Sequence, residues 1–252
     1  MTPGALYLVP APLDFGCDAV TPLADVMPER TLRVAAGLSH WICESAKTTR
    51  AYLKRIGEIY PLALPLQSIA MQELPREVHK KGDHQGTFDA KHLLQPILEG
   101  HSMGLVSEAG MPAIADPGSS VVRAAHDLGV TVVPLVGPVS LLLALAASGL
   151  NGQNFAFVGY IPSTPAERAQ RLRELESLAL KTGQTQLLIE TPYRNTALLQ
   201  TMLQTLQHNT RLATASGLTL DKAQCHSAVV KDWKQRAWGV DNATPTVFAI
   251  GR

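Results

Sequence analysis

The sequence has few cysteines and no excess of charge of either sign. Cys17, Cys43 and Cys225 are the only cysteines in 252 residues and lie far apart, so neither a disulfide framework nor a Cys-x-x-Cys site is indicated, and a reducing compartment is expected. The 22 Lys and Arg residues against 21 Asp and Glu residues give a formal net charge of +1. This balance neither indicates nucleic-acid binding nor excludes a local basic patch.

Phosphate-binding glycine motifs are also missing. Neither G-x-G-x-x-G nor G-x-x-x-x-G-K-[ST] occurs in the chain, and these are the motifs with which many α/β proteins cradle a pyrophosphate. The loop after the first expected strand, residues 10–13, reads Pro-Ala-Pro-Leu and cannot present a row of backbone N–H groups. We therefore expect a ligand poor in phosphate rather than NAD or ATP. The histidines show no metal-ligand spacing, so no metal site is predicted.

Signals for a membrane or for secretion are weak. Residues 132–150 form an apolar, uncharged run of about one membrane thickness. Gly137-Pro138 breaks this run and would leave backbone polar groups unsatisfied in lipid, so a buried strand, turn and helix are expected instead. No basic region precedes an apolar stretch at the N-terminus, and a cytoplasmic location is expected.

The periodicity predicts an α/β fold. A composition of 46% hydrophobic and 17% charged residues supports a large core. Expected strands at 5–10, 103–107 and 130–136 alternate with helices at 119–128 and 140–147, which indicates a parallel sheet covered on both faces. The last of these helices is all Leu, Ala and Ser, so we expect it to be buried on every side.

A second α/β half follows a linker at 151–155, which gives two domains, 1–150 and 151–252. Its expected strands and helices lie at 155–160, 165–180, 186–189, 195–206, 212–215 and 246–250. The charged side chains of the helix at 165–180 are expected to form a solvated face.

Three other segments are less regular. Residues 31–45 are mixed in pattern, with a strand expected to end near Glu44, and an amphipathic helix is expected to begin at Ala46. Residues 67–86 are polar and are the best candidate for a mobile loop. A helix is expected from Thr87 to about Leu98.

The most informative stretch is residues 105–118, Leu-Val-Ser-Glu-Ala-Gly-Met-Pro-Ala-Ile-Ala-Asp-Pro-Gly. A buried strand ends there in a loop with two glycines, two prolines and two acids, Glu108 and Asp116. Small residues let a ligand approach the backbone, and ligands of open α/β sheets bind at the carboxyl ends of the strands. The alternative is an ordinary strand-to-helix loop with an N-cap at Asp116 or Ser119.

This stretch, followed by Val-Val-Pro-Leu-Val-Gly-Pro-Val-Ser-Leu-Leu-Leu-Ala-Leu at 132–145, resembles the core of the tetrapyrrole methylase superfamily. Within that superfamily the likeness is greatest to the methylases of ribosomal RNA ribose. Further matching segments are residues 6–10, 149–150, 159–160, Glu-Thr-Pro-Tyr-Arg at 190–194, and Thr219.

The resemblance implies a homodimer of two-domain subunits with mainly parallel sheets, and S-adenosyl-L-methionine in the interdomain cleft. It implies rRNA or the small ribosomal subunit as a partner. The cofactor-binding positions that it implies are Pro12, Glu108, Ala109, Gly110, Met111, Ile114, Asp116, Ser140, Glu190, Thr191, Ala215, Pro245 and Thr246. Taken singly, Ser140 could instead be a helix N-cap, Ala215 a core residue and Pro245 the start of an edge strand.

Two residues are candidates for work on the methyl acceptor. Methyl transfer to a ribose hydroxyl needs in-line positioning and is helped by a general base, and Glu44 at a strand end is the first candidate, with a merely capping or buried role as the alternative. Arg194 could hold an RNA phosphate or a tetrapyrrole carboxylate. Its alternative is a salt bridge across the domain interface. Lys47 and Arg50 could extend such a patch or form an exposed helix face.

The chain departs from the family pattern on the acceptor side. Leu13-Asp14-Phe15 stands where the family has Gly-Asn, a His-rich motif is missing, and Ser216-Gly217 stands in place of an Arg-Glu pair. Three functions therefore stay open: ribose methylation of small-subunit rRNA, C-methylation of a small tetrapyrrole, and non-catalytic binding of S-adenosylmethionine.

Overall fold

The computed structural model describes residues 4–75, 77–78, 83 and 88–252. The chain divides into two compact units, of which unit 1 comprises Met1–Phe15 and Thr21–Pro138, and unit 2 comprises Gly16–Val20 and Val139–Arg252. The main division falls directly before the helix α7 (Ser140–Ser148), earlier in the chain than the predicted boundary at residue 150.

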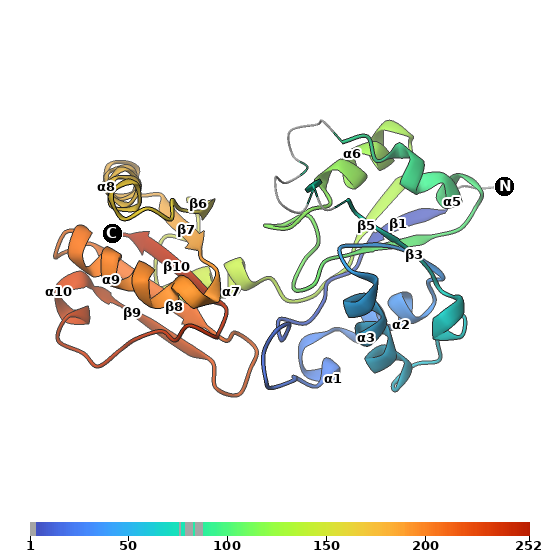
Figure 1. The fold of residues 1–252 in the computed structure, drawn as a ribbon, viewed down its shortest axis with the longest axis horizontal. Coiled ribbons are helices and arrows are strands. Elements are labelled where there is room, and N and C mark those ends of the chain that lie inside the picture. The colour runs from blue at the N-terminus through green and yellow to red at the C-terminus, as the bar shows by residue number, and fades with distance from the viewer. Residues whose placement is uncertain (1–3, 76, 79–82, 84–87) are drawn as a thin grey trace. The chain divides into compact units, whose positions relative to one another are not determined.

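Unit 1 contains a five-stranded sheet in the order β3-β2-β4-β1-β5, and all of its strand pairs are parallel. This is the parallel sheet that the alternation of apolar strands and helices predicts. Its elements, blue to green in Figure 1, are β1 (Ala5–Leu8), α1 (Leu23–Val26), α2 (Glu29–Ala36), β2 (His40–Cys43), α3 (Ala46–Gly57), η1 (Leu66–Ser68), β3 (Ala70–Glu73), η2 (Lys91–Leu94), α5 (Gln95–Leu98), β4 (Met103–Val106), α6 (Ser119–Asp127) and β5 (Thr131–Pro134).

Each face of this sheet has its own apolar core. One cluster joins Trp41 of β2 to Leu32 of α2 and Leu53 of α3. The other joins the neighbouring residue Ile42 to Leu94 and Val121, from η2 and α6. Successive strand residues point to opposite faces, so the apolar run of β2 serves both cores.

Unit 2 contains the second five-stranded sheet, in the order β6-β7-β10-β8-β9. The fold class of two α/β units is confirmed, but the expectation of mainly parallel sheets is wrong for this sheet. Only β6 and β7 pair in parallel, and the other pairs are antiparallel. Its elements are β6 (Phe155–Tyr160), α8 (Pro165–Thr182), β7 (Thr185–Ile189), η3 (Pro192–Arg194), α9 (Asn195–Thr205), β8 (Arg211–Ser216), β9 (Gln224–Val229), α10 (Val230–Trp233) and β10 (Thr246–Gly251), after α7.

The central strand β10 explains how unit 2 is layered. Phe248 packs in a cluster with Leu172 of α8 and Leu198 of α9, whereas the adjacent Val247 packs with Leu141 and other residues of α7. Alternation along the strand therefore places α8 and α9 on one face of the sheet and α7 on the other.

The helix α7 is not buried on all sides, contrary to the sequence expectation. Leu141 and Leu145 are buried, but Leu142 is 50% exposed and Leu143 is 40% exposed. The helix packs on a sheet with one side only. Its other side is apolar and exposed. The sequence does not predict this difference, because a Leu- and Ala-rich helix has the same composition on both sides.

Among the described residues, two edge strands and the helices α1, α2 and α10 were not predicted from the sequence. Residues 31–36, mixed in pattern, belong to the helix α2, in which Leu32 and Ala35 are buried and Arg33 is exposed. The edge strands β3 and β9 are only partly buried, and they lack the apolar run that made the other strands recognisable.

Part of the expected mobile loop at 67–86 lies outside the described residues, as does Thr87 at the start of the expected helix. Within the described part, η1 and β3 occupy 66–73, and the expected helix is a 3-10 turn, η2, followed by α5. In the part of the chain that the structure describes, no helix is both long enough and apolar enough to cross a bilayer.

Candidate functional site

The loop at 107–118 follows β4 at the carboxyl end of the parallel sheet. It is tied to the loop that follows β1, because Ala11 and Gly110 exchange backbone hydrogen bonds of 2.9 and 3.0 Å. Gly110 has φ +70°, and a Cβ there would lie 3.3 Å from Cδ2 of Leu13. The positive φ therefore favours glycine at 110, and a Cβ there would also press against the Leu13 side chain.

The same loop holds unusual backbone geometry. Ala113 has φ 63° and Ala115 has φ 67°, a left-handed conformation that costs a non-glycine residue about 1 kcal/mol or more. Gly118, at the end of the loop, has φ +135°. Such strain is retained where the surrounding structure fixes it, and it gathers at ligand sites.

Carboxylates from two adjacent strands meet beside this loop. Glu44 directly follows β2, and its Oε1 accepts a 3.3 Å hydrogen bond from the backbone N–H of Glu108. Burial, together with the negative charges of Glu44 and Glu108, raises the pKa of Asp116 from 3.8 to about 7. The predicted residues Glu44, Glu108 and Asp116 are thus brought into one electrostatically coupled group.

The start of α6 corrects the proposed N-cap. Gly118 occupies the N-cap position and no side chain of the cap residue bonds the helix, so neither Asp116 nor Ser119 is the cap. Instead, Asp83 accepts hydrogen bonds from Gly118, Ser119 and Ser120. No local sequence pattern predicts this role for Asp83, because its hydrogen-bond donors lie 35 to 37 residues further along the chain.

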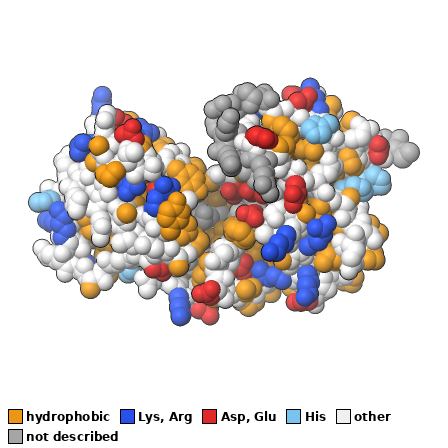
Figure 2. Space-filling view, viewed as in Figure 1, with side chains coloured by type: hydrophobic (Ala, Val, Ile, Leu, Met, Phe, Trp, Pro, Cys, Tyr) orange, Lys and Arg blue, Asp and Glu red, His pale blue; other side chains and the backbone are white. Residues whose placement is uncertain are grey.

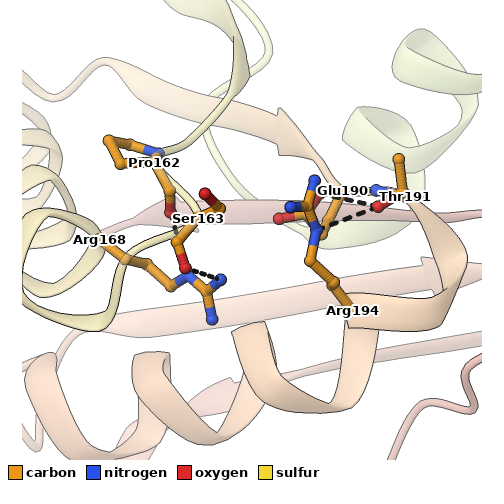
Figure 3. Close-up of polar contacts among 6 residues, drawn as sticks. All are labelled: Pro162, Ser163, Arg168, Glu190, Thr191 and Arg194. Carbon is orange, nitrogen blue, oxygen red and sulfur yellow. Dashed lines mark hydrogen bonds and ion pairs between the residues drawn. The ribbon is translucent and has the colours of Figure 1, made fainter.

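In unit 2, the Glu-Thr-Pro-Tyr-Arg segment builds a compact ionic group at the end of β7 (Figure 3). Arg194 forms a 2.8 Å ion pair with Oε1 of Glu190, whose side chain is fully buried, while the Arg194 side chain is 30% exposed. Thr191 donates to the same oxygen and accepts a 3.1 Å bond from Nε of Arg194. The salt bridge of Arg194 therefore lies within its own unit, not across the domain interface.

The guanidinium of Arg194 also meets an aromatic ring. Its Cζ lies 5.2 Å from the ring centroid of Tyr193, a distance at which a cation and a ring face attract each other. Tyr193 is 67% exposed. Arg194 is therefore fixed on its buried side and accessible on the other.

Strand pairing brings the remaining predicted residues of unit 2 to the same end of three neighbouring strands. β10 runs antiparallel to β7 and β8, so its first residue, Thr246, pairs with Ser216 beyond Ala215, and Val247 pairs with Ile189 just before Glu190. Oγ1 of Thr246 lies 2.8 Å from Oγ of Ser216. This end of the sheet therefore carries Glu190, Thr191, Ala215, Pro245 and Thr246.

Several buried polar atoms at these edges have no hydrogen-bond partner among the described residues. They include Oγ of Ser107, Oε2 of Glu190 and Oδ1 of Asn195. Asn195 donates to the carbonyl of Thr244 and to Oγ1 of Thr246, so its amide is held in place. An unsatisfied buried polar atom is costly unless water, an ion or a ligand pairs with it.

Two other expectations need correction. Ser140 is the first residue of α7 and not its N-cap, a position that Val139 takes without a side-chain bond. The helix α8 is not simply a solvated charged face, because Arg168 and Glu176 are buried. Arg168 donates to the carbonyls of Pro162 and Ser163 (Figure 3), and Glu176 accepts from Thr210.

A basic face begins next to Glu44. Lys47, Arg50 and Lys54 of α3 are exposed at spacings that share one side of a helix, and none forms a salt bridge with another described residue. Figure 2 shows Lys and Arg side chains gathered over this part of unit 1. Ser45 caps the helix by accepting from the backbone N–H of Thr48.

A solved structure identifies the class of fold. The chain is similar in structure to the uroporphyrin-III-C-methyltransferase of Thermus thermophilus, with a TM-score of 0.54 and 18% sequence identity, over 98% of this chain and 94% of that one. The tetrapyrrole methylase fold expected from the central motif is therefore confirmed. No protein-family model matches the chain.

In sequence, the chain is similar to proteins named ribosomal RNA small subunit methyltransferase I. The relative from Mesorhizobium japonicum is 30% identical over 215 residues, 85% of this chain and 64% of the relative. The relative from Vibrio cholerae is 38% identical over 137 residues, 54% of this chain and 46% of the relative. The chain thus spans about half to under two thirds of the length of these relatives. The resemblance recognised from the motifs is confirmed.

Proposed function

We propose that the protein is an S-adenosyl-L-methionine-dependent methyltransferase that acts on a ribose 2′-hydroxyl of small-subunit rRNA. The observation that carries this proposal is the sequence similarity to proteins named ribosomal RNA small subunit methyltransferase I, which extends over 85% of this chain in one relative. Such a substrate also implies a cytoplasmic enzyme that takes part in rRNA processing.

Each unit, taken by itself, has residues that suit S-adenosylmethionine. In unit 1, Ala109 and Gly110 offer backbone without bulky side chains, and Ser107 supplies a buried hydroxyl oxygen with no partner among the described residues. In unit 2, Glu190 and Asn195 each supply one such oxygen. Unpaired acceptors can accept hydrogen bonds from the amino and hydroxyl groups of S-adenosylmethionine. This ligand contains no phosphate, which agrees with a chain that lacks a phosphate-binding motif.

When bound, the cofactor supplies an electrophilic methyl group on a sulfonium. The protein's own part is to orient the acceptor hydroxyl in line with that methyl and to take up the proton. Glu44 is the proposed base, because it stands at a strand end beside the loop and is anchored by the N–H of Glu108. Asp116, with a pKa of about 7, is a second carboxyl able to take up a proton near neutral pH.

RNA binding is supported by two features of different kinds. The exposed Lys47, Arg50 and Lys54 offer phosphate contacts along α3. Arg194, held in place by Glu190 and Thr191, presents a guanidinium with a fixed orientation, which suits a phosphate oxygen.

A second candidate function is C-methylation of a small tetrapyrrole. The solved structure from Thermus thermophilus carries the name of such an enzyme, and Arg194 would suit a tetrapyrrole carboxylate equally well.

We also propose a homodimer, because the exposed apolar side of α7, with Leu142 and Leu143, could be covered by a second copy.

The test compares ribose methylation of small-subunit rRNA in cells with and without the gene. Loss of one 2′-O-methyl group, restored by the wild-type gene, supports the proposal. An unchanged methylation map contradicts it. Glu44→Gln separates catalysis from binding alone: it should fail to restore the methyl group while retaining cofactor affinity, whereas a non-catalytic protein would have no methylation for the variant to lose.

A further inference from the structure

Asp83 is a buried carboxylate that contacts the end of the 107–118 loop. It is only 4% exposed. Its Oδ2 accepts from the backbone N–H of Gly118 at 2.9 Å and of Ser120 at 2.8 Å, and from Oγ of Ser120 at 2.5 Å. Its Oδ1 accepts from Oγ of Ser119 at 2.7 Å. Two backbone and two hydroxyl donors therefore converge on one side chain.

These bonds keep Asp83 ionised. Burial alone would raise the pKa of Asp83, but the hydrogen bonds from Ser120, Ser119 and Gly118 outweigh it and lower the pKa below its ordinary value. The carboxylate also lies at the N-terminus of α6, where the helix dipole favours negative charge. Asp83 thus provides the cap that Gly118, without a side chain, cannot provide.

The contact matters for the loop as well as for the helix. Near its start the loop is fixed by the backbone pair of Gly110 and Ala11, and at its end it is fixed by Asp83. Between these two anchors lie Ala113 and Ala115 in left-handed conformations. A Cβ on Gly118 would lie 3.3 Å from the backbone nitrogen of Ala113, so the anchored end packs directly against the strained part.

We propose that Asp83 is a positioning residue for cofactor binding, which holds the segment between Gly110 and Gly118 in the conformation that contacts S-adenosylmethionine. This inference rests on the proposed function. A residue that only capped α6 would contribute to stability without altering cofactor affinity. A positioning residue contributes to both, because a released loop must be ordered again when the ligand binds.

The test uses Asp83→Asn, which keeps the side-chain size but places an amide donor where backbone N–H donors now converge. Glu176→Gln is the matched control: Glu176 is also a buried carboxylate, and it accepts from the N–H of Gln207 at 2.7 Å and from Thr210 Oγ1 at 2.5 Å, but it belongs to unit 2 and the loop belongs to unit 1. Both variants are expected to unfold at lower urea concentration. Only Asp83→Asn should weaken the binding of S-adenosylhomocysteine, measured as Kd by calorimetry. Each 1.4 kcal/mol that is needed to order the loop again raises Kd about tenfold.

The outcomes separate the two proposals. If the wild-type protein binds S-adenosylhomocysteine and Asp83→Asn binds it equally well, the positioning role is wrong and the proposed function stands. If the wild type binds neither the cofactor nor its product, the proposed function fails first. Should Asp83→Asn not fold, Ser119→Ala removes one of the four bonds, and amide hydrogen exchange then decides. Faster exchange in the loop with weaker product binding supports the role, and unchanged exchange with unchanged affinity overturns it.

Discussion

Arg194 is bound to the buried Glu190 through an ion pair of 2.8 Å, and Thr191 bridges the two. Replacing Arg194 with Gln would leave a buried carboxylate without its cation. We expect a loss of roughly 2 kcal/mol in the free energy of unfolding, measured by urea denaturation. The matched control is Arg171→Gln, which breaks the exposed pair with Glu174, with side chains 43% and 51% exposed, and should change stability by less than about 1 kcal/mol. Equal effects of the two substitutions would contradict this account.

Asp116 should make stability fall as pH rises. Its pKa in the folded protein, about 7, is above the ordinary 3.8, so the native state binds the proton more tightly than the unfolded state does. The stabilisation is present in acid and is lost as pH rises through about 7. Asp116→Asn should therefore be more stable than the wild type at alkaline pH, by up to roughly 4 kcal/mol, and the difference should shrink towards pH ~4.

The measurement is the urea midpoint across this pH range, with the exposed Asp221 changed to Asn as control. A difference between Asp116→Asn and wild type that stayed constant with pH would show that Asp116 does not titrate in this window.

Gly110 offers a test of the loop's backbone. Gly110→Ala places a Cβ on a residue with φ +70° and within 3.3 Å of Leu13, whereas Gly129→Ala does so at φ +68° in open space. Both should lose about 1 kcal/mol of stability. Only Gly110→Ala should also weaken S-adenosylhomocysteine binding, measured by calorimetry, because only Gly110 lies in the loop. A Gly110→Ala protein with wild-type affinity would remove this segment from the binding site.

The basic face of α3 predicts a salt-dependent contact with RNA. Changing Lys47, Arg50 and Lys54 to Gln should weaken binding to small-subunit rRNA and reduce the slope of log affinity against log salt by roughly 3, about 1 for each phosphate contact. Fluorescence anisotropy over a salt series measures both. The control is the same change at three exposed lysines of unit 2, Lys222, Lys231 and Lys234. An equal loss in the two triple variants would mean that the effect is only one of net charge.

Much of the fold could be predicted because most of the strands are apolar runs that are recognisable in the sequence. The central strands β1, β4, β7, β8 and β10, and the edge strand β5, fall where apolar runs end in turn residues. The antiparallel pairing of β10 could not be predicted, because a strand buried on both faces looks the same in either direction. The helix α2 was mistaken because Thr31 and Val34 are β-branched, and only their tertiary packing reveals a helical period.

The site was predictable where its residues are close in sequence. The loop at 107–118 carries its own constraints in its glycines and prolines, and Glu190 to Arg194 form one short segment. Asp83 was not predictable, because its role depends on contacts that only the folded chain brings together. The burial of Glu176 was missed for the same reason, because it accepts from the distant N–H of Gln207. Arg168 was missed although its partners are near, because its bonds to the carbonyls of Pro162 and Ser163 depend on how the segment before α8 folds back.

Thermal unfolding with and without S-adenosylmethionine or S-adenosylhomocysteine tests most directly whether this protein binds S-adenosylmethionine. A ligand of the native state at a concentration of about 100 times its Kd stabilises the protein by about 2.7 kcal/mol, so we predict a clear, concentration-dependent rise in melting temperature that adenosine alone does not reproduce. A melting curve that is unchanged at millimolar concentrations of both compounds would contradict the account.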